Sequence, residues 1–245
     1  MSKRKWLVAA GILIVFLGFA LVRFPVALAA GFLPATLQLT GGEGTVWQGR
    51  ASALGLGGMA VQHDIAWQLQ PQRLLRGQLA WEIKGKFAAE QSRLTLAVSP
   101  NAVEVRDMQV ALPLEPLLAQ DAKLKPLRLG GMLKLQSAVF TLQRPSELSA
   151  RVENLFSALV PGIGALGNTQ IQLSVPNSQA ASWAARPEDG PMAINGEGTL
   201  DLKRGKVAGK LTFKPDNKLA GNLRPILSLL QQDANGEYTL ALPSS

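Results

Sequence analysis

The sequence predicts a mainly β protein, with an N-terminal transmembrane helix followed by an antiparallel, curved or half-open β-sheet domain that has a few short helices. Three observations predict this fold. Hydrophobic residues make up 47% of the 245 residues and charged residues only 17%, which excludes an extended disordered chain. A long uncharged apolar run lies near the N-terminus. Beyond it, short runs alternate apolar with polar residues and are separated by glycine and proline.

The apolar run extends from Trp6 to Val22. As a helix it would be about 25 Å long, which nearly spans the hydrocarbon core of a bilayer. The basic residues 3–5 precede the run, and after Arg23 no lysine or arginine occurs before Arg50. By the positive-inside rule the N-terminus is cytoplasmic and the rest of the chain is exported, so we expect a single-pass membrane protein.

The alternative for this region is a cleaved signal peptide, because Ala27-Leu28-Ala29 resembles a signal-peptidase site. The apolar run is longer than most signal-peptide cores, and Arg23 and Pro25 lie before the site, so an uncleaved anchor is the preferred interpretation. We therefore expect residues 1–23 to form a cytoplasmic tip and transmembrane anchor, and residues 24–245 to form one exported β-rich domain.

Period-two alternation predicts the strands of this domain. Ile65, Trp67 and Leu69 alternate with polar or small residues, as expected of a strand with one buried face. The same alternation recurs at residues 79–83, 94–98, 103–105, 108–112, 133–135, 140–142, 171–175, 200–202, 211–213 and 238–242. Tight glycine-containing turns are predicted at Arg76-Gly77, Gly130-Gly131 and Arg204-Gly205. Short turns without long crossover helices favour antiparallel pairing.

Three segments favour a helix, namely residues 114–120, 155–166 and 223–232. In the third, four apolar residues share one helical face: Leu223, Ile226, Leu227 and Leu230. Asn235-Gly236 follows and can end that helix in a left-handed cap. Residues 177–191 are rich in Ser, Ala, Gly and Pro and are predicted to be an exposed loop.

The sequence contains no recognisable catalytic, cofactor-binding or metal-binding constellation. Absence of cysteine excludes disulfides and thiol chemistry. The single histidine, His63, is adjacent to Asp64 in a predicted strand, where neighbouring side chains point to opposite faces and cannot easily act together. Residues 162–167 match G-x-G-x-x-G, but no convincing strand precedes and no helix follows, so a nucleotide site is not expected.

The charge pattern limits the classes of partner that the protein can bind. The net charge of +8 is spread along the chain among acidic residues, without a nucleic-acid-binding motif. We expect a protein that is not an enzyme, has no cofactor and binds no nucleic acid. Trp47, Trp67 and Trp81 lie on predicted strands, where they either fill a core or line an apolar groove.

The run Gly44-Thr45-Val46-Trp47-Gln48-Gly49, then Trp67-Gln68-Leu69, then Leu74-Leu75-Arg76-Gly77-Gln78-Leu79, follows the N-terminal anchor in that order. In this feature the chain resembles the general secretion pathway protein N family of type II secretion systems. The C-terminal segment Gly221–Leu242 looks similar too. The resemblance supplies no catalytic residues, and it suggests that the matching Gly44, Trp47, Gly49, Trp67 and Gly77 determine the fold.

The resemblance implies an accessory inner-membrane component of the apparatus that exports folded proteins across the outer membrane. Such a protein would scaffold or contact other inner-membrane subunits of the secretion system. The alternative is an AsmA-like lipid-binding or lipid-transfer protein of the envelope, because an anchor followed by a curved sheet with aliphatic inward positions also fits that plan. A periplasmic hydrolase is disfavoured, since no nucleophile and base are placed together.

Overall fold

The computed structural model describes residues 20, 22–31, 33–204, 206–217, 219–233 and 237–242. The predicted anchor segment 1–23 lies outside the described residues except for Ala20, Val22 and Arg23, and Gly205 and Asn235-Gly236 also lie outside them. In the part of the chain that the structure describes, no helix has the length and apolar character needed to cross a membrane.

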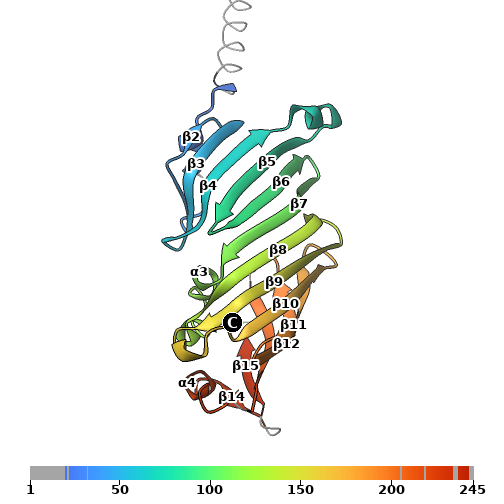
Figure 1. Ribbon diagram of the computed structural model, residues 1–245. Coiled ribbons are helices and arrows are strands. Elements are labelled where there is room, and N and C mark those ends of the chain that lie inside the picture. Colours follow the sequence, from blue (N-terminus) through green and yellow to red (C-terminus); the bar gives the residue numbers. More distant parts are fainter. Residues whose placement is uncertain are drawn as a thin grey trace, which may run out of the picture.

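The described residues form one 15-stranded sheet, in which every strand pairing is antiparallel (Figure 1). Nearly every strand pairs with its neighbour in sequence, in the order β1-β3-β4-β5-β6-β7-β8-β9-β10-β11-β12-β13-β15-β14, with β2 paired to β3. The strands are β1 (Leu37–Thr40), β2 (Glu43–Gly44), β3 (Gln48–Leu56), β4 (Met59–Leu69), β5 (Leu79–Phe87), β6 (Glu90–Ser99), β7 (Ala102–Pro113), β8 (Leu129–Thr141), β9 (Ser146–Ser157), β10 (Gly167–Val175), β11 (Ala180–Asp189), β12 (Met192–Asp201), β13 (Lys206–Pro215), β14 (Gln231–Gln232) and β15 (Tyr238–Leu242). The predicted mainly β, antiparallel, open sheet is confirmed.

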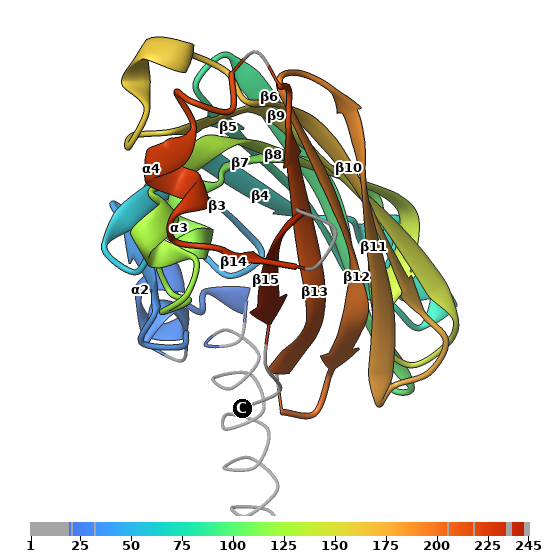
Figure 2. The same ribbon diagram turned by 90° about the horizontal axis from the view of Figure 1, so that it is seen from below.

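Figure 2 shows that the sheet curls around a concave side, where α3 and α4 lie. The curvature has a cause in the backbone. Register shifts occur in β4 beside Asp64 and in β7 beside Asp107, and both residues have positive φ, of 46° and 49°. A β-bulge of this kind adds a residue to one strand and increases the local twist, so the sheet bends.

The helical segments are all short. They are α2 (Val26–Ala30), α3 (Glu115–Leu118), α4 (Arg224–Leu227) and the 3₁₀ turns η1 (Pro71–Arg76), η2 (Lys125–Leu127) and η3 (Pro161–Ile163). The predicted helices at 114–120 and 223–232 are confirmed in part as α3 and α4, each a single turn. All four residues of the apolar face predicted in segment 223–232 are buried.

Three local predictions are wrong. Residues 155–166 are the end of β9, η3 and a turn, since Leu166 N donates to Leu155 O at 2.5 Å and closes a β9–β10 connection. Gly130-Gly131 lies inside β8, at a bulge rather than a turn. Residues 180–189 form strand β11 instead of a loop, because both edges pair, with β10 and with β12, and Ala181 and Ala185 are buried.

The two faces of the sheet differ in chemistry. Along β5 and β6, Trp81 is paired with Leu96 and Ile83 with Leu94, whereas the alternate residue Lys84 is paired with Arg93. The apolar face is the concave one, because its residues from β8 to β15 pack against α3 and α4. Alternation of this kind follows from the two-residue period of a strand.

The main core lies at the C-terminal half of the concave face. The connections that contain α3 and α4 cover this half, and Leu166 and Leu223 there are 0% exposed. Burial of a leucine side chain contributes about 1.5–3 kcal/mol, so these short connections stabilise the curved sheet more than their length suggests. Lys123 Nζ, in the connection after α3, donates to Ala241 O at 3.1 Å and links the β7–β8 connection to β15.

Candidate functional site

The sequence-predicted positions meet where the chain enters the sheet, at a corner that we call the tryptophan corner (Trp47, Trp67 and Trp81 with residues 44–49). Trp67 Nε1 donates to the Thr45 carbonyl oxygen at 2.9 Å, and Trp81 Nε1 donates to the Val46 carbonyl oxygen at 3.0 Å. The Trp47 and Trp81 rings stack with centroids 6.2 Å apart and an interplanar angle of 11°. Because the indole N–H groups of the half-buried Trp67 and Trp81 have acceptors, the corner is held by hydrogen bonds as well as by ring contact.

Glycine is required at two places in this corner. Gly44 has φ +94°, a left-handed conformation that other residues adopt with strain, and a Cβ there would lie 2.6 Å from the Gln48 carbonyl oxygen. At Gly49 a Cβ would overlap the Trp67 ring and the Glu43 carbonyl oxygen. The space under the Trp67 ring is therefore available only because Gly49 has no side chain.

Gly77 belongs to a different local structure. It ends η1 with φ 69°, and its N–H donates to Leu74 O at 2.9 Å. The turn predicted at Arg76-Gly77 is therefore present between η1 and β5. Of the five predicted positions, four lie in the tryptophan corner and Gly77 lies at the end of the β4–β5 connection.

The corner also fixes the incoming N-terminal segment. Val46 N donates to Phe24 O at 3.0 Å, and Pro25 forms an isolated antiparallel bridge with Thr45. On the other side, Leu69 N donates to Trp47 O at 2.7 Å. The chain is thus bound to the sheet from residue 24 onward, directly after the predicted end of the anchor.

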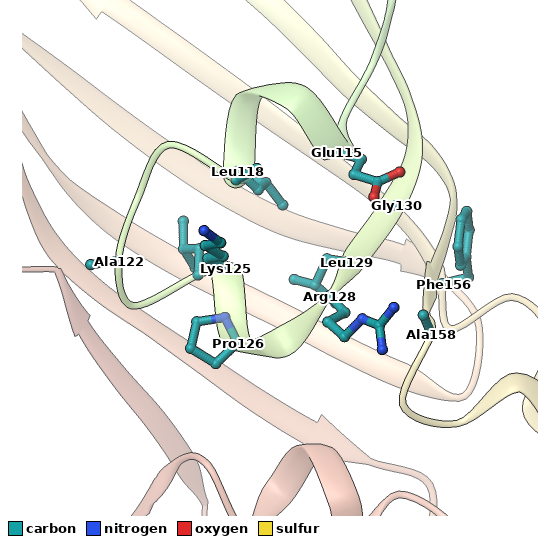
Figure 3. A pocket seen from close by; sticks show the side chains of 12 residues that line it. Glu115, Leu118, Ala122, Lys125, Pro126, Arg128, Leu129, Gly130, Phe156 and Ala158 are labelled. Carbon is teal, nitrogen blue, oxygen red and sulfur yellow. The ribbon is translucent and has the colours of Figure 1, made fainter. Parts of the chain in front are cut away.

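Two hollows lie on or beside the concave side. The smaller, about 160 Å³, is lined by aliphatic side chains that include Leu54, Ile83, Leu94 and Val110. The larger, about 560 Å³, lies beside the β7–β8 connection (Figure 3). Figure 3 shows Leu118, Lys125 and Arg128 from that connection on one side and Phe156 from β9 on the other. Its lining combines apolar groups with single charges and contains no catalytic constellation.

The other face of the sheet carries ion pairs within and between strands. Arg106 donates to Glu104 at 2.6 Å and, with Arg144, holds the pKa of Glu104 below its ordinary value, against the opposite effect of burial. Lys134 bridges Glu153 and Glu90, each at 2.9 Å, and hydrogen bonds to these two carboxylates raise its pKa. The Lys134–Glu153 pair joins the neighbouring strands β8 and β9, and such a cross-strand pair stabilises sheet pairing modestly.

The remaining candidates for chemistry are not brought together. Asp64 pairs with Lys86, whose hydrogen bond lowers the pKa of Asp64, and this pairing does not prepare His63 as a base. Residues 162–167 lead into strand β10 rather than a helix, so they lack the context of a nucleotide-binding loop. Among the described residues, no three His, Asp or Glu side chains are grouped as metal ligands would be.

Sequence reasoning missed one aromatic site. The Trp183 ring lies over Gly196, Gly198 and Gly209, where a Cβ at any of the three would meet it. Trp183 Nε1 is buried and has no hydrogen-bond partner among the described residues, unlike the indole of Trp67. Two glycines at spacing i, i+2, opposite a tryptophan on the neighbouring strand, are the sequence signal that could have found it.

Comparison with known proteins identifies the family. The family model for protein N of the type II secretion system (T2SS) matches residues 35–241. The chain belongs to this protein N family. A Type II secretion system protein N from Vibrio cholerae serotype O1 is 29% identical, over 87% of this chain and 86% of the relative. One from Aeromonas hydrophila is 26% identical, over 97% of each chain.

No solved structure matches the chain. The protein N family and both relatives are named for a secretion system, and neither name describes an enzyme. The expected protein N resemblance is thereby confirmed over most of the described sheet, beyond the tryptophan corner that first indicated it.

Proposed function

We propose that the protein is an accessory inner-membrane component of a type II secretion system, which scaffolds or contacts other subunits during export of folded proteins across the outer membrane. In this proposal residues 1–23 are the cytoplasmic tip and single transmembrane anchor, and residues 24–245 are the periplasmic domain. Membership of the protein N family supports the secretion role. The basic residues before the apolar run support the orientation.

One observation carries the scaffolding mechanism. Phe24 and Pro25 are already bound to residues 45–46 of the sheet, so no flexible linker separates the domain from the proposed anchor. A domain attached in this way stays beside the membrane, and its effective concentration near other membrane subunits is raised without any additional contact. The family's secretion role and the absence of a linker at residues 24–25 favour the same function.

We further propose that Gly44, Trp47, Gly49, Trp67 and Gly77 determine the fold and do not contact a ligand. The bonds of Trp67 and Trp81 to residues 45–46 support this role. The tryptophans fix the incoming segment, and the glycines leave room for a ring or permit a positive φ. Their contribution to secretion would be indirect, through the position of the domain relative to the membrane.

The lipid-handling alternative is not proposed. Its partner would need a pocket, and drug-sized ligands occupy pockets of about 300–1,000 Å³. The aliphatic hollow at Leu54 and Val110 has only about 160 Å³. The hollow beside the β7–β8 connection has about 560 Å³, but charged Glu115, Lys125 and Arg128 line it, and α3 and α4 cover the C-terminal half of the concave face. Lipid binding therefore stays a prediction of the sequence that lipid analysis of the purified protein can test.

The experiment for the scaffolding proposal is crosslinking in the intact cell envelope. The full chain should capture inner-membrane subunits of the secretion system. In the matched control, residues 1–23 are replaced by a cleavable signal peptide, so that the same domain is released into the periplasm. Capture should fall in the control because the effective concentration falls. Recovery of no secretion subunit with the anchored chain would contradict the proposal.

A further inference from the structure

The β4–β5 connection exposes two leucines. Leu75 is 91% exposed and Leu74 is 46% exposed, both in η1. They are flanked by Arg73 and Arg76. The acidic Glu82 lines the same hollow as these arginines, and its carboxylate is paired with Lys84 and Arg93. Adjacent apolar and basic side chains on a protruding turn are the composition of a segment that contacts a membrane interface.

The turn holds these side chains in place. Arg73 Nε donates to Gln70 Oε1 at 2.8 Å, and Gln78 N donates to Arg73 O at 3.1 Å. Gln70 N donates to Ala80 O at 2.7 Å, which ties the start of the turn to β5. Pro71 at the start and Gly77 in a left-handed cap fix both ends of η1. The leucines are therefore presented by an ordered turn and are not left exposed by fraying.

The position of η1 in the fold indicates what its exposed leucines contact. Trp47 O accepts the N–H of Leu69, two residues before η1, and Val46 next to it binds Phe24. The apolar run Trp6–Val22 thus leads into the sheet at the corner from which η1 also projects. Figure 1 shows the chain entering at the same end of the sheet as the teal coil between β4 and β5. A bilayer that contains the anchor would lie against this end.

We propose that η1 is a second membrane contact, in which Leu74 and Leu75 enter the bilayer interface and Arg73 and Arg76 bind the phosphates of anionic phospholipids. This inference rests on the proposed anchored topology. Basic side chains complement anionic headgroups, and a leucine pair between them matches the boundary between headgroups and acyl chains. With one contact at the anchor and one at η1, the domain would have a fixed orientation on the membrane.

The chain lacks cysteine, so a single introduced thiol can be labelled without background. Full-length Leu75→Cys carries an environment-sensitive fluorophore and is reconstituted into vesicles of phosphatidylethanolamine and phosphatidylglycerol. The matched control is Leu229→Cys, which is also exposed, at 48%, and follows α4 at the opposite end of the sheet in Figure 1. Acyl-chain spin-labelled lipid should quench the label at residue 75 and leave the label at residue 229 unchanged.

A second variant tests the basic residues. Arg73→Gln with Arg76→Gln, in the Leu75→Cys background, should reduce quenching, and addition of salt should reduce it in the original chain. Circular dichroism checks that each variant is folded. Because Arg73→Gln also removes the hydrogen bond from Arg73 to Gln70, Arg76→Gln alone, at an exposed position, tests the effect of charge and should also reduce quenching.

The outcomes separate the inference from the proposed function. A chain that floats with the vesicles while the label at residue 75 stays accessible to aqueous iodide overturns the inference and leaves the anchored topology intact. A chain that does not float overturns both. The label at residue 75 could also be shielded from iodide in the cell envelope but accessible to iodide in vesicles that contain no other protein. That result would show a protein partner at η1 and would also overturn the membrane contact.

Discussion

The Gly49→Ala variant should unfold at a lower urea concentration than the original chain, because the substitution disrupts the tryptophan corner. The new Cβ would overlap the Trp67 ring and the Glu43 carbonyl oxygen, and both belong to rigid groups. Overpacking of this kind costs about 1–3 kcal/mol. Displacement of the ring would also weaken the Trp67–Thr45 hydrogen bond, which adds about 1 kcal/mol. The expected loss is therefore about 2–4 kcal/mol of the free energy of unfolding.

The assay is urea unfolding of the full chain in detergent micelles, followed by far-ultraviolet circular dichroism. Gly162→Ala is the matched control, because a Cβ at Gly162 meets no atom within 4 Å. The control should change the free energy of unfolding by less than about 0.5 kcal/mol. In a Trp67→Leu background, Gly49→Ala should cost less, since only the Glu43 carbonyl oxygen then opposes the Cβ. Equal unfolding midpoints for Gly49→Ala and Gly162→Ala would refute the reasoning.

Three further predictions concern the core, the indoles and pH. Ile226→Ala should lower the free energy of unfolding by about 2–5 kcal/mol in urea unfolding, whereas Leu229→Ala, at an exposed site, should change it by less than about 0.5 kcal/mol. Trp67→Phe should cost about 1–3 kcal/mol more than Trp183→Phe, because only the first removes a hydrogen bond; equal losses in parallel melts would count against it. The lowered pKa of Glu104 stabilises the fold above its ordinary value of 4.5, and this contribution is lost as pH falls through the folded-state pKa. Acid titration of Glu104→Gln should therefore show a shallower loss of stability than the original chain.

Much of the sheet follows from alternation, and the physical reason is visible in single pairs. Trp81 and Ile83 face the concave side and are apolar, whereas Lys84, the next residue of β5, faces the other side and is charged. Each strand shows this pattern locally, and short connections force neighbours to pair. Fold class and strand pairing could therefore be predicted without knowledge of distant contacts.

Other elements depend on contacts that no local pattern encodes. Strand β11 was predicted to be a loop because small residues lack a strong period-two signal, yet two neighbouring strands pair with it on both sides. The bulges at Asp64 and Asp107 rest on single residues with positive φ. A single aspartate carries no periodic signal. The sequence therefore predicts that the sheet is curved, but not at which residues it bends.

The candidate site divides in the same way. Gly49 and Trp67 could be singled out through the family resemblance, but the overlap that requires glycine is visible only in three dimensions. The leucines of η1 belong to the family motif at residues 74–79. Their exposure results from a 3₁₀ turn, which apolar periodicity does not predict.

The order of strand pairing has a consequence for how the molecule is made. From β3 to β13, each strand pairs with the one synthesised just before it. A chain that emerges with its N-terminus first can therefore add strands one at a time to a growing edge, without waiting for its C-terminus. The packing of Leu223 and Ile226 onto earlier strands can form only after α4 has been made, and the bond from Lys123 to Ala241 only after the last strand has been made. Until then, the newest strand presents an unpaired edge that other chains could bind, which makes prompt elongation and early attachment to a surface protective against aggregation.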